Sequence, residues 1–134
     1  MKKIRVLVID DDPVKAAAYA SAFDLDGFRM QLVGNGGAGF AALQMFAPDI
    51  VILDVSVHVK NGLRWLAAAR DLPGFERLPV IVVTGASPHS SQFAAARAFG
   101  VQRVLSRKLW SPVSIVAAVR RAIRPAVSPL ERAA

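Results

Sequence analysis

The sequence predicts a doubly wound α/β fold, with one five-stranded parallel sheet between two layers of helices. Short apolar segments alternate with segments of helical character along all but the last ten of the 134 residues. Two apolar segments, 49–54 and 79–84, lack the polar alternation of a half-exposed strand, which is typical of strands covered on both faces. Strict strand–helix alternation with right-handed crossovers produces such a sandwich. A chain of this length can bury the core of one domain.

Five segments have the character of strands. Residues 28–33 (FRMQLV) alternate apolar and polar side chains, as an edge strand with one wet face does. The other segments are more continuously apolar and suit the middle of the sheet. The expected strands are 3–9, 28–33, 49–54, 79–84 and 102–106.

Five further segments are predicted to be helices, and several carry start or stop signals. The pairs Asp12–Pro13 and Ser111–Pro112 each combine an N-cap residue with a proline at the first helical position. Asn61 is a candidate cap for a third helix, and Gly27 is the expected stop of the first. The expected helices are 13–26, 36–47, 62–71, 90–99 and 112–124.

Composition excludes several classes of protein and site. The chain has no cysteine, which excludes disulfides, thiolate metal sites and a cysteine nucleophile. No apolar run is long enough to cross a bilayer, and the N-terminal segment lacks the core of a signal peptide. We therefore expect a cytoplasmic protein without a membrane partner. Residues 1–124 form the expected domain, and 125–134, with two prolines and no periodicity, form a C-terminal tail or linker stub.

The net charge of +7 is concentrated near the C-terminus. Residues 1–96 hold nine lysines and arginines and nine acids, so they are neutral. Residues 97–134 hold eight cations against Glu131 alone. Such a surface suits an acidic protein partner or self-association through residues 97–124, and weak nucleic-acid contact is the less favoured reading. A solvated arginine-rich face without a partner is an equally weighted alternative.

Polar side chains gather where the expected strands end. Residues 10–12 (DDD) follow the first strand, Asp54 ends the third, Thr84 ends the fourth, and Arg107 and Lys108 follow the fifth. Carboxyl ends of parallel strands share one edge of the sheet, where ligands bind. Clustered carboxylates repel one another unless a cation joins them, and Mg²⁺ accepts such oxygen ligands. A shielded phosphoryl group could then be attacked by a carboxylate and held by a hydroxyl and a cation.

These motifs resemble the receiver domain of bacterial two-component response regulators. The resemblance rests on VLVIDDDP, on PDIVILD with Gly62 eight residues after Asp54, on PVIVVTG, and on a lysine before an SP-capped helix. It covers about residues 3–124 and implies a flavodoxin-like, three-layer sandwich with strand order 2-1-3-4-5.

The resemblance also implies a role for each matching residue. Asp54 corresponds to the phosphoacceptor, Thr84 to the switch hydroxyl and Lys108 to the phosphoryl-binding lysine. The implied Mg²⁺ ligands are Asp10, Asp11, Asp54 and the backbone carbonyl of Ser56. The implied partner is a histidine kinase or phosphotransfer protein, and the domain is a signalling switch rather than a metabolic enzyme.

The chain departs from the family pattern around the fifth strand. Counting back from Ser111 places Lys108 at the lysine position, whereas counting forward from Gly100 places Arg107 there. We favour Lys108, because an ammonium is a compact point charge, with Arg107 as the alternative. The family's strand-five aromatic is replaced by Val104 or Leu105, so Trp110 or the loop backbone is left to carry the signal. His58 stands where the family usually has proline.

Two other functions remain open at this point. A degenerate receiver would bind its partner without phosphorylation, and the altered strand-five loop motivates that alternative. A nucleotide-binding protein is the remote alternative, because Gly34–Gly39 reads GxGxxG after a strand and Asp54 follows about 20 residues later. The preceding strand looks like an edge strand, however, whereas the strand before such a fingerprint is normally central.

Overall fold

The computed structural model describes residues 2–55 and 59–123, which fold into a five-stranded parallel sheet in the order β2-β1-β3-β4-β5. This confirms the predicted fold class and strand order. The edge position of β2 agrees with its alternating sequence. The strands are β1 (Ile4–Ile9), β2 (Phe28–Val33), β3 (Ile50–Val55), β4 (Val80–Thr84) and β5 (Arg103–Ser106).

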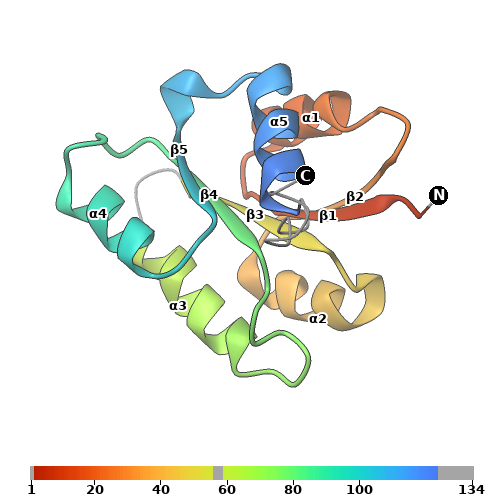
Figure 1. Ribbon diagram of the computed structural model, residues 1–134, viewed down its shortest axis with the longest axis horizontal. Coiled ribbons are helices and arrows are strands. Elements are labelled where there is room, and N and C mark those ends of the chain that lie inside the picture. Colours follow the sequence, from red (N-terminus) through yellow and green to blue (C-terminus); the bar gives the residue numbers. More distant parts are fainter. Residues whose placement is uncertain (1, 56–58, 124–134) are drawn as a thin grey trace, which may run out of the picture.

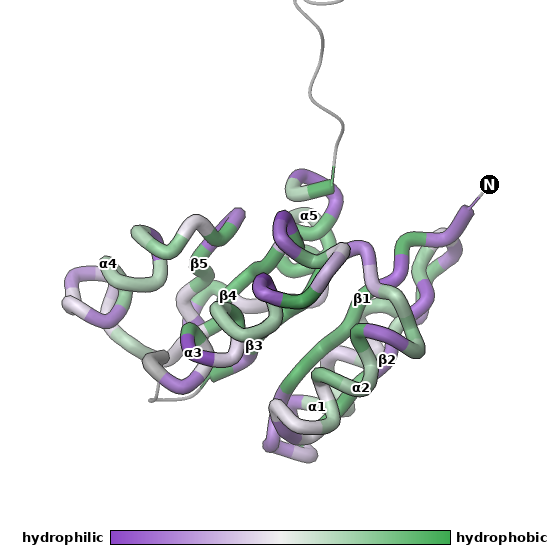
Figure 2. The backbone as a smooth tube through the Cα atoms, turned by 90° about the horizontal axis from the view of Figure 1, so that it is seen from below, coloured by the Kyte–Doolittle hydropathy of each residue, from purple (hydrophilic) through white to green (hydrophobic). Residues whose placement is uncertain are grey.

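Helices cover both faces of the sheet (Figure 1). The elements that connect or follow the strands are α1 (Pro13–Ala22), α2 (Gly36–Phe46), α3 (Val59–Arg70), α4 (Ser91–Ala98), the 3₁₀ turn η1 (Arg107–Leu109) and α5 (Pro112–Ala122). Helices α1 and α5 pack on one face, while α2 and α3 pack on the other, so each face has its own apolar core. The central strands run between these layers as continuous hydrophobic segments (Figure 2).

Two helix boundaries differ from the sequence prediction. Helix α1 ends at Ala22 rather than at residue 26, because Phe23 leaves the helix and packs edge-on against Phe28, with ring centroids 5.2 Å apart. Helix α3 begins at Val59, so Asn61 lies in its first turn instead of capping it. The remaining predicted elements match to within about two residues, which is the usual uncertainty at helix ends.

The two Pro-containing start signals are confirmed. The Asp12 carboxylate accepts a hydrogen bond from the Val14 N–H at 3.0 Å, and Pro13 is the first residue of α1. Ser111 and Ser114 form a reciprocal capping box at the start of α5. Within residues 2–55 and 59–123, none of the helices has the length and apolar character needed to cross a membrane.

Candidate functional site

Three acids from two neighbouring strands line one cavity at the carboxyl edge of the sheet. The cavity has a volume of about 280 Å³, and its lining includes Asp10 and Asp11 after β1 and Asp54 near the end of β3. Strands β1 and β3 are hydrogen-bonded neighbours, with Ile9 opposite Leu53, so their ends deliver these acids side by side. The α2 loop and the first turn of α3 close the other walls of the cavity. This arrangement brings together the three carboxylates that the sequence placed at strand ends.

Asp54 is buried and already has three polar neighbours. Its side chain is 0% exposed, and Arg107 forms an ion pair with its Oδ1 atom. Lys15 Nζ lies 3.6 Å from the same oxygen. The Tyr19 hydroxyl donates a 2.6 Å hydrogen bond to Oδ2. Two cations and one donor therefore stabilise a carboxylate that burial alone would disfavour.

Within the part of the chain that the structure describes, Asp10 has a buried carboxylate oxygen without a protein partner, which a bound cation would satisfy. Its Oδ1 accepts a hydrogen bond from the Asp12 N–H at 3.0 Å, but its Oδ2 is buried without a hydrogen-bond partner among the described residues. Burial raises the pKa of Asp10 above its ordinary value, and the neighbouring Asp11 carboxylate acts in the same direction. A buried oxygen of this kind costs free energy unless a donor or metal ion satisfies it.

The donor set fits a hard divalent ion, although it is not a closed cage. Carboxylate oxygens at the edge of an open, water-accessible cavity are the ligands that Mg²⁺ uses when it keeps several waters. In the described part of the chain, no three acidic or histidine side chains form a complete metal-binding group. Ser56, whose carbonyl was the fourth expected ligand, and His58 lie outside the described residues.

The residue beside Asp54 from the β5 side is Arg107, the alternative assignment, and not Lys108, the favoured one. Strand β5 pairs with β4 up to Ser106 opposite Thr84, so Arg107 is the first residue past the strand. Its guanidinium reaches Asp54, whereas Lys108 lies one residue further along η1 and is exposed. The count forward from Gly100 agrees with this contact, whereas the count back from Ser111 gives the exposed Lys108.

Thr84 ends β4 as predicted and is fully buried. Its Oγ1 accepts a hydrogen bond from the Ala86 N–H at 3.0 Å, which turns the hydroxyl toward its own loop. Val55, next to Asp54, is its neighbour in the β3–β4 ladder. Thr84 thus lies beside the acid site, with its hydroxyl oxygen engaged by the backbone.

Packing explains two of the three glycines of the GxGxxG motif, Gly36 and Gly39. A Cβ atom at Gly36 would lie 2.8 Å from the Trp65 ring, and one at Gly39 would lie 2.8 Å from Ile9 Cδ1. The Trp65 indole N–H also donates to the Gly36 carbonyl at 2.9 Å. These glycines let α2 approach Trp65 closely, so a phosphate-binding loop is not needed to explain them.

Comparison with known proteins identifies the family. Residues 6–120 match the family described as response regulator receiver domain. The chain belongs to this family. As a receiver, it shares a signalling-switch scaffold whose members generally bind Mg²⁺ at the acidic pocket and interact with histidine kinases and output domains.

Individual relatives support the same assignment. The chain is 34% identical over 98 residues to the "Probable transcriptional regulatory protein TcrX" of Mycobacterium tuberculosis, covering 72% of this chain and 41% of that protein. It is 27% identical over 120 residues to the DNA-binding response regulator MtrA of Mycolicibacterium smegmatis, covering 90% and 50% of the two chains. This receiver therefore spans half or less of the length of these two relatives.

Solved structures show the same fold. The chemotaxis response regulator CheY4 of Vibrio cholerae superposes with a TM-score of 0.77 at 21% identity, covering 90% of this chain and 99% of that one. A response regulator protein from Burkholderia multivorans has a TM-score of 0.69 at 29% identity and covers 96% and 100% of the two chains.

The receiver also contains site residues that sequence analysis missed. Tyr19 and Lys15 both reach Asp54 from α1, where they lie four residues apart and so share one helix face. Burial raises the pKa of Tyr19 well above its usual range, so the hydroxyl stays protonated and can donate. The available signal was weak: Tyr19 is the only tyrosine of the chain, and it interrupts an alanine-rich helix.

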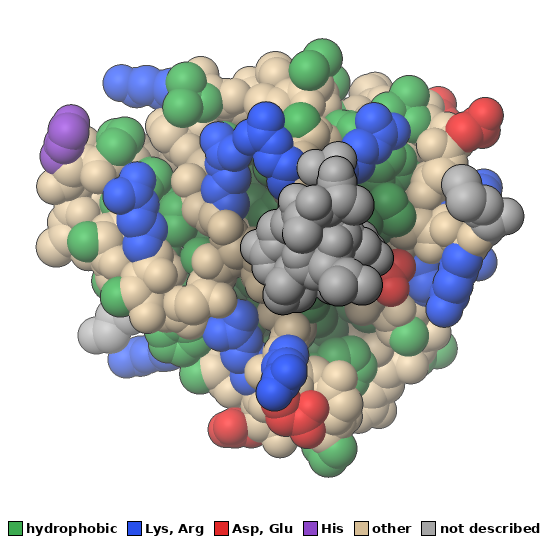
Figure 3. All heavy atoms as spheres, in the orientation of Figure 1, with side chains coloured by type: hydrophobic (Ala, Val, Ile, Leu, Met, Phe, Trp, Pro, Cys, Tyr) green, Lys and Arg blue, Asp and Glu red, His purple; other side chains and the backbone are tan. Residues whose placement is uncertain are grey.

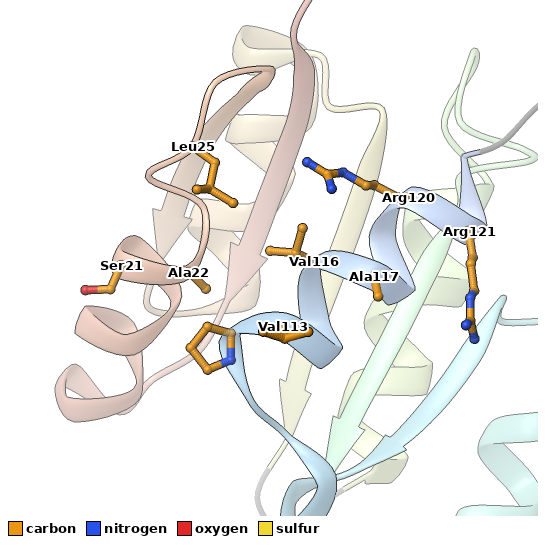
Figure 4. Close-up of a pocket in the computed structure, with 9 residues that line it drawn as sticks. Ser21, Ala22, Leu25, Val113, Val116, Ala117, Arg120 and Arg121 are labelled. Carbon is orange, nitrogen blue, oxygen red and sulfur yellow. The ribbon is translucent and has the colours of Figure 1, made fainter.

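Exposed arginines and lysines of the predicted basic region spread over α4, β5, η1 and α5 (Figure 3). A groove of about 650 Å³ runs between α1 and α5, and Leu25, Val116 and Arg120 project into it (Figure 4). Among the described residues of the basic set, the exposed ones are Arg97, Arg103, Lys108, Arg120 and Arg121. Arg107 differs from them because it is half-buried against Asp54.

Proposed function

We propose that this domain is a phospho-accepting receiver in which Asp54 takes a phosphoryl group from a histidine kinase or phosphotransfer protein. The observation that carries the proposal is the cavity shared by Asp54, Asp10 and Asp11 at the carboxyl edge of the sheet. An Asp54 oxygen attacks the phosphorus of a phosphohistidine, the P–N bond breaks, and the imidazole leaves. The product is an aspartyl phosphate, which biases a two-state equilibrium of the domain.

Mg²⁺ is the cofactor that this reaction requires, with Asp10, Asp11, Asp54 and the Ser56 carbonyl as its ligands. When bound, the ion would neutralise charge on the transferring phosphoryl group. The buried, unsatisfied Asp10 Oδ2 supports this assignment, because a cation would remove its desolvation cost.

Two residues at the ends of β4 and β5 are proposed to hold the phosphoryl oxygens. Arg107 already forms an ion pair with Asp54, and a guanidinium can donate two parallel hydrogen bonds to a phosphoryl group. The Thr84 hydroxyl would contribute a further hydrogen bond after leaving the Ala86 N–H. Lys108, exposed on η1, would then belong to the docking surface.

The output is proposed to be protein interaction within the cytoplasm rather than catalysis. The exposed cations on α4, β5, η1 and α5 suit an acidic partner or a second copy of the domain. In this proposal residues 1–124 form the switch, and 125–134 form a tail or a link to another domain. Nucleic acid is a less favoured partner.

The test is phosphorylation by a small-molecule donor such as acetyl phosphate, read by intact mass. With Mg²⁺ the wild-type chain should gain the mass of one phosphoryl group, and Asp54→Asn should gain none. EDTA should prevent the gain in the wild type. If the wild type gains no mass from this donor or from a phosphorylated phosphotransfer protein, the proposed function is wrong.

A receiver that acts without phosphorylation is the second candidate, and one observation favours it. Both oxygens of Asp54 are engaged, by Tyr19 on one side and by Arg107 and Lys15 on the other. If both oxygens stay bonded to these partners, Asp54 cannot attack a phosphoryl group and would serve only as one member of a structural ion pair. The same mass experiment separates the two candidates, because only an acceptor that can open will gain the phosphoryl group.

A further inference from the structure

The acceptor Asp54 is connected to the start of α5 by two aromatic side chains. The Tyr19 hydroxyl donates to Asp54 Oδ2 at 2.6 Å, and Tyr19 is 1% exposed. The Tyr19 ring meets Trp110 edge-to-face, with centroids 5.2 Å apart and planes at 80°. Tyr19 therefore contacts the acceptor through its hydroxyl and Trp110 through its ring.

Trp110 is placed where a small displacement would reach the helix that follows. It directly precedes Ser111, the N-cap of α5, and its backbone N–H donates to the Arg107 carbonyl at 3.1 Å. The Ser114 hydroxyl, part of the capping box, also donates to the Leu109 carbonyl at 2.9 Å. Movement of Trp110 would consequently change the loop and the first turn of α5 together.

The Trp110 indole N–H is buried and forms no hydrogen bond of good geometry among the described residues. The polar group beside it is the Tyr19 hydroxyl, so a small shift of either ring changes this contact. By contrast, the Trp65 indole donates to the Gly36 carbonyl. A buried donor without a partner is a cost that an alternative position could relieve.

We propose that Tyr19 couples the state of Asp54 to Trp110 and the start of α5, acting as a positioning residue for the acceptor. This inference rests on the proposed function for its biological meaning, but the coupling itself exists without phosphate. A new bond or a lost charge at Asp54 removes or redirects the Tyr19 hydrogen bond. The Tyr19 ring then shifts against Trp110, which reports the change at the surface.

The coupling can be measured in the unphosphorylated protein from the indole signals in a proton–nitrogen correlation spectrum. The two tryptophans are assigned with Trp110→Phe. Asp54→Ala should displace the Trp110 indole signal, and it should leave the Trp65 signal nearly unchanged. In a Tyr19→Phe background, which keeps the ring and removes only the hydroxyl, most of that displacement should disappear. Ser21→Ala is the matched control, because it removes an exposed hydroxyl from the same helix.

A competing route runs from Asp54 through Arg107 and the loop backbone, and the same cycle excludes or supports it. An equal displacement with and without the Tyr19 hydroxyl, or none in either background, would overturn the proposal. Thermal unfolding of each variant confirms that the compared proteins are folded. If Tyr19→Phe alone fails to fold, the effect of Asp54→Ala is measured instead on the backbone signals of Ser111 and Ser114, with and without Trp110→Phe. The proposal requires that these signals respond to Asp54→Ala when Trp110 is present and lose that response when its indole is removed.

A second measurement adds beryllium fluoride and Mg²⁺, which together mimic an aspartyl phosphate. The Trp110 signal should move in the wild type and in Ser21→Ala, and it should move much less in Tyr19→Phe. If phosphoryl transfer is detected by mass while Trp110 responds equally in Tyr19→Phe, the coupling is wrong and the proposed function stands. If no phosphoryl transfer occurs but the unphosphorylated cycle shows the coupling, the proposed function fails and the coupling stands.

Discussion

The ion pair between Arg107 and Asp54 predicts an asymmetric response to mutation. Asp54 has a fully buried side chain, whereas the Arg107 side chain is 29% exposed. Removing Arg107 leaves a carboxylate whose side chain is fully buried, while removing the charge of Asp54 leaves a guanidinium whose Nε and Nη2 are buried but whose side chain is partly exposed. Arg107→Ala should therefore destabilise the metal-free protein more than Asp54→Asn does.

The structure allows the sizes to be bounded. Removing one partner of a buried pair typically costs about 3–5 kcal/mol. Lys15 Nζ, 3.6 Å from the same carboxylate oxygen, compensates part of that cost, so we expect roughly 2–4 kcal/mol for Arg107→Ala. Asp54→Asn keeps an oxygen that can accept from Tyr19 and should cost about 1 kcal/mol. In the double variant neither charge is left alone, so its cost should be about 2 kcal/mol below the sum of the single costs.

Urea unfolding followed by far-ultraviolet circular dichroism, in EDTA, measures all four proteins of the cycle. Arg103→Ala is the matched control, because Arg103 is exposed on β5 and its loss should change stability by less than about 0.5 kcal/mol. Arg107→Lys should recover most of the stability, since it keeps the positive charge. A coupling energy below about 0.5 kcal/mol, or an Asp54→Asn variant less stable than Arg107→Ala, would refute the reasoning.

Three further predictions concern the cavity, the glycine contact and the surface. Because burial raises the pKa of Asp10, the metal-free folded state keeps this proton to higher pH than the unfolded chain does, so stability should fall as the pH rises from 3.8 through the raised pKa. Asp10→Asn should remove that fall, as chemical denaturation at several pH values would show, and it should weaken Mg²⁺ binding in a metal titration. Gly39→Ala should destabilise the domain by about 0.5–2 kcal/mol, because overpacking against Ile9 and Trp65 outweighs the gain in helix propensity. Gly37→Ala in the same helix should be neutral or stabilising in the same unfolding assay. Charge reversal to glutamate at the exposed Arg97, Arg120 and Arg121 should weaken binding to an acidic partner, or self-association, several-fold in low salt. Unchanged binding would remove the docking surface from the proposal.

Strand positions and the strand-end acids were predictable because they depend on local pattern. The apolar run ending at Asp54 defines a buried strand, and the shared edge of a parallel sheet then places Asp54 near Asp10 and Asp11. The caps Asp12 and Ser111 were equally readable, since a cap depends on residues only two or three positions apart.

Contacts between distant elements were not predictable in the same way. The hydrogen bond from Tyr19 to Asp54 spans 35 residues and depends on how α1 rests on the sheet. The choice between Arg107 and Lys108 depends on where β5 stops pairing with β4, and two countings of the loop gave different answers. The early end of α1 is associated with the contact between Phe23 and Phe28 across a turn, and helix propensity does not predict such a contact.

The departures from the family pattern around the fifth strand lie in one small region of the structure. A valine at position 104 leaves the fifth strand without a ring, while Tyr19 and Trp110 place two rings between Asp54 and the start of α5. Arg107 contacts Asp54 and Trp110, three residues later, packs against Tyr19, so both contacts depend on the loop after β5. Shortening that loop by deleting Lys108 should therefore disturb both contacts together, and an indole signal of Trp110 that is unaffected by the deletion would show that the two are independent.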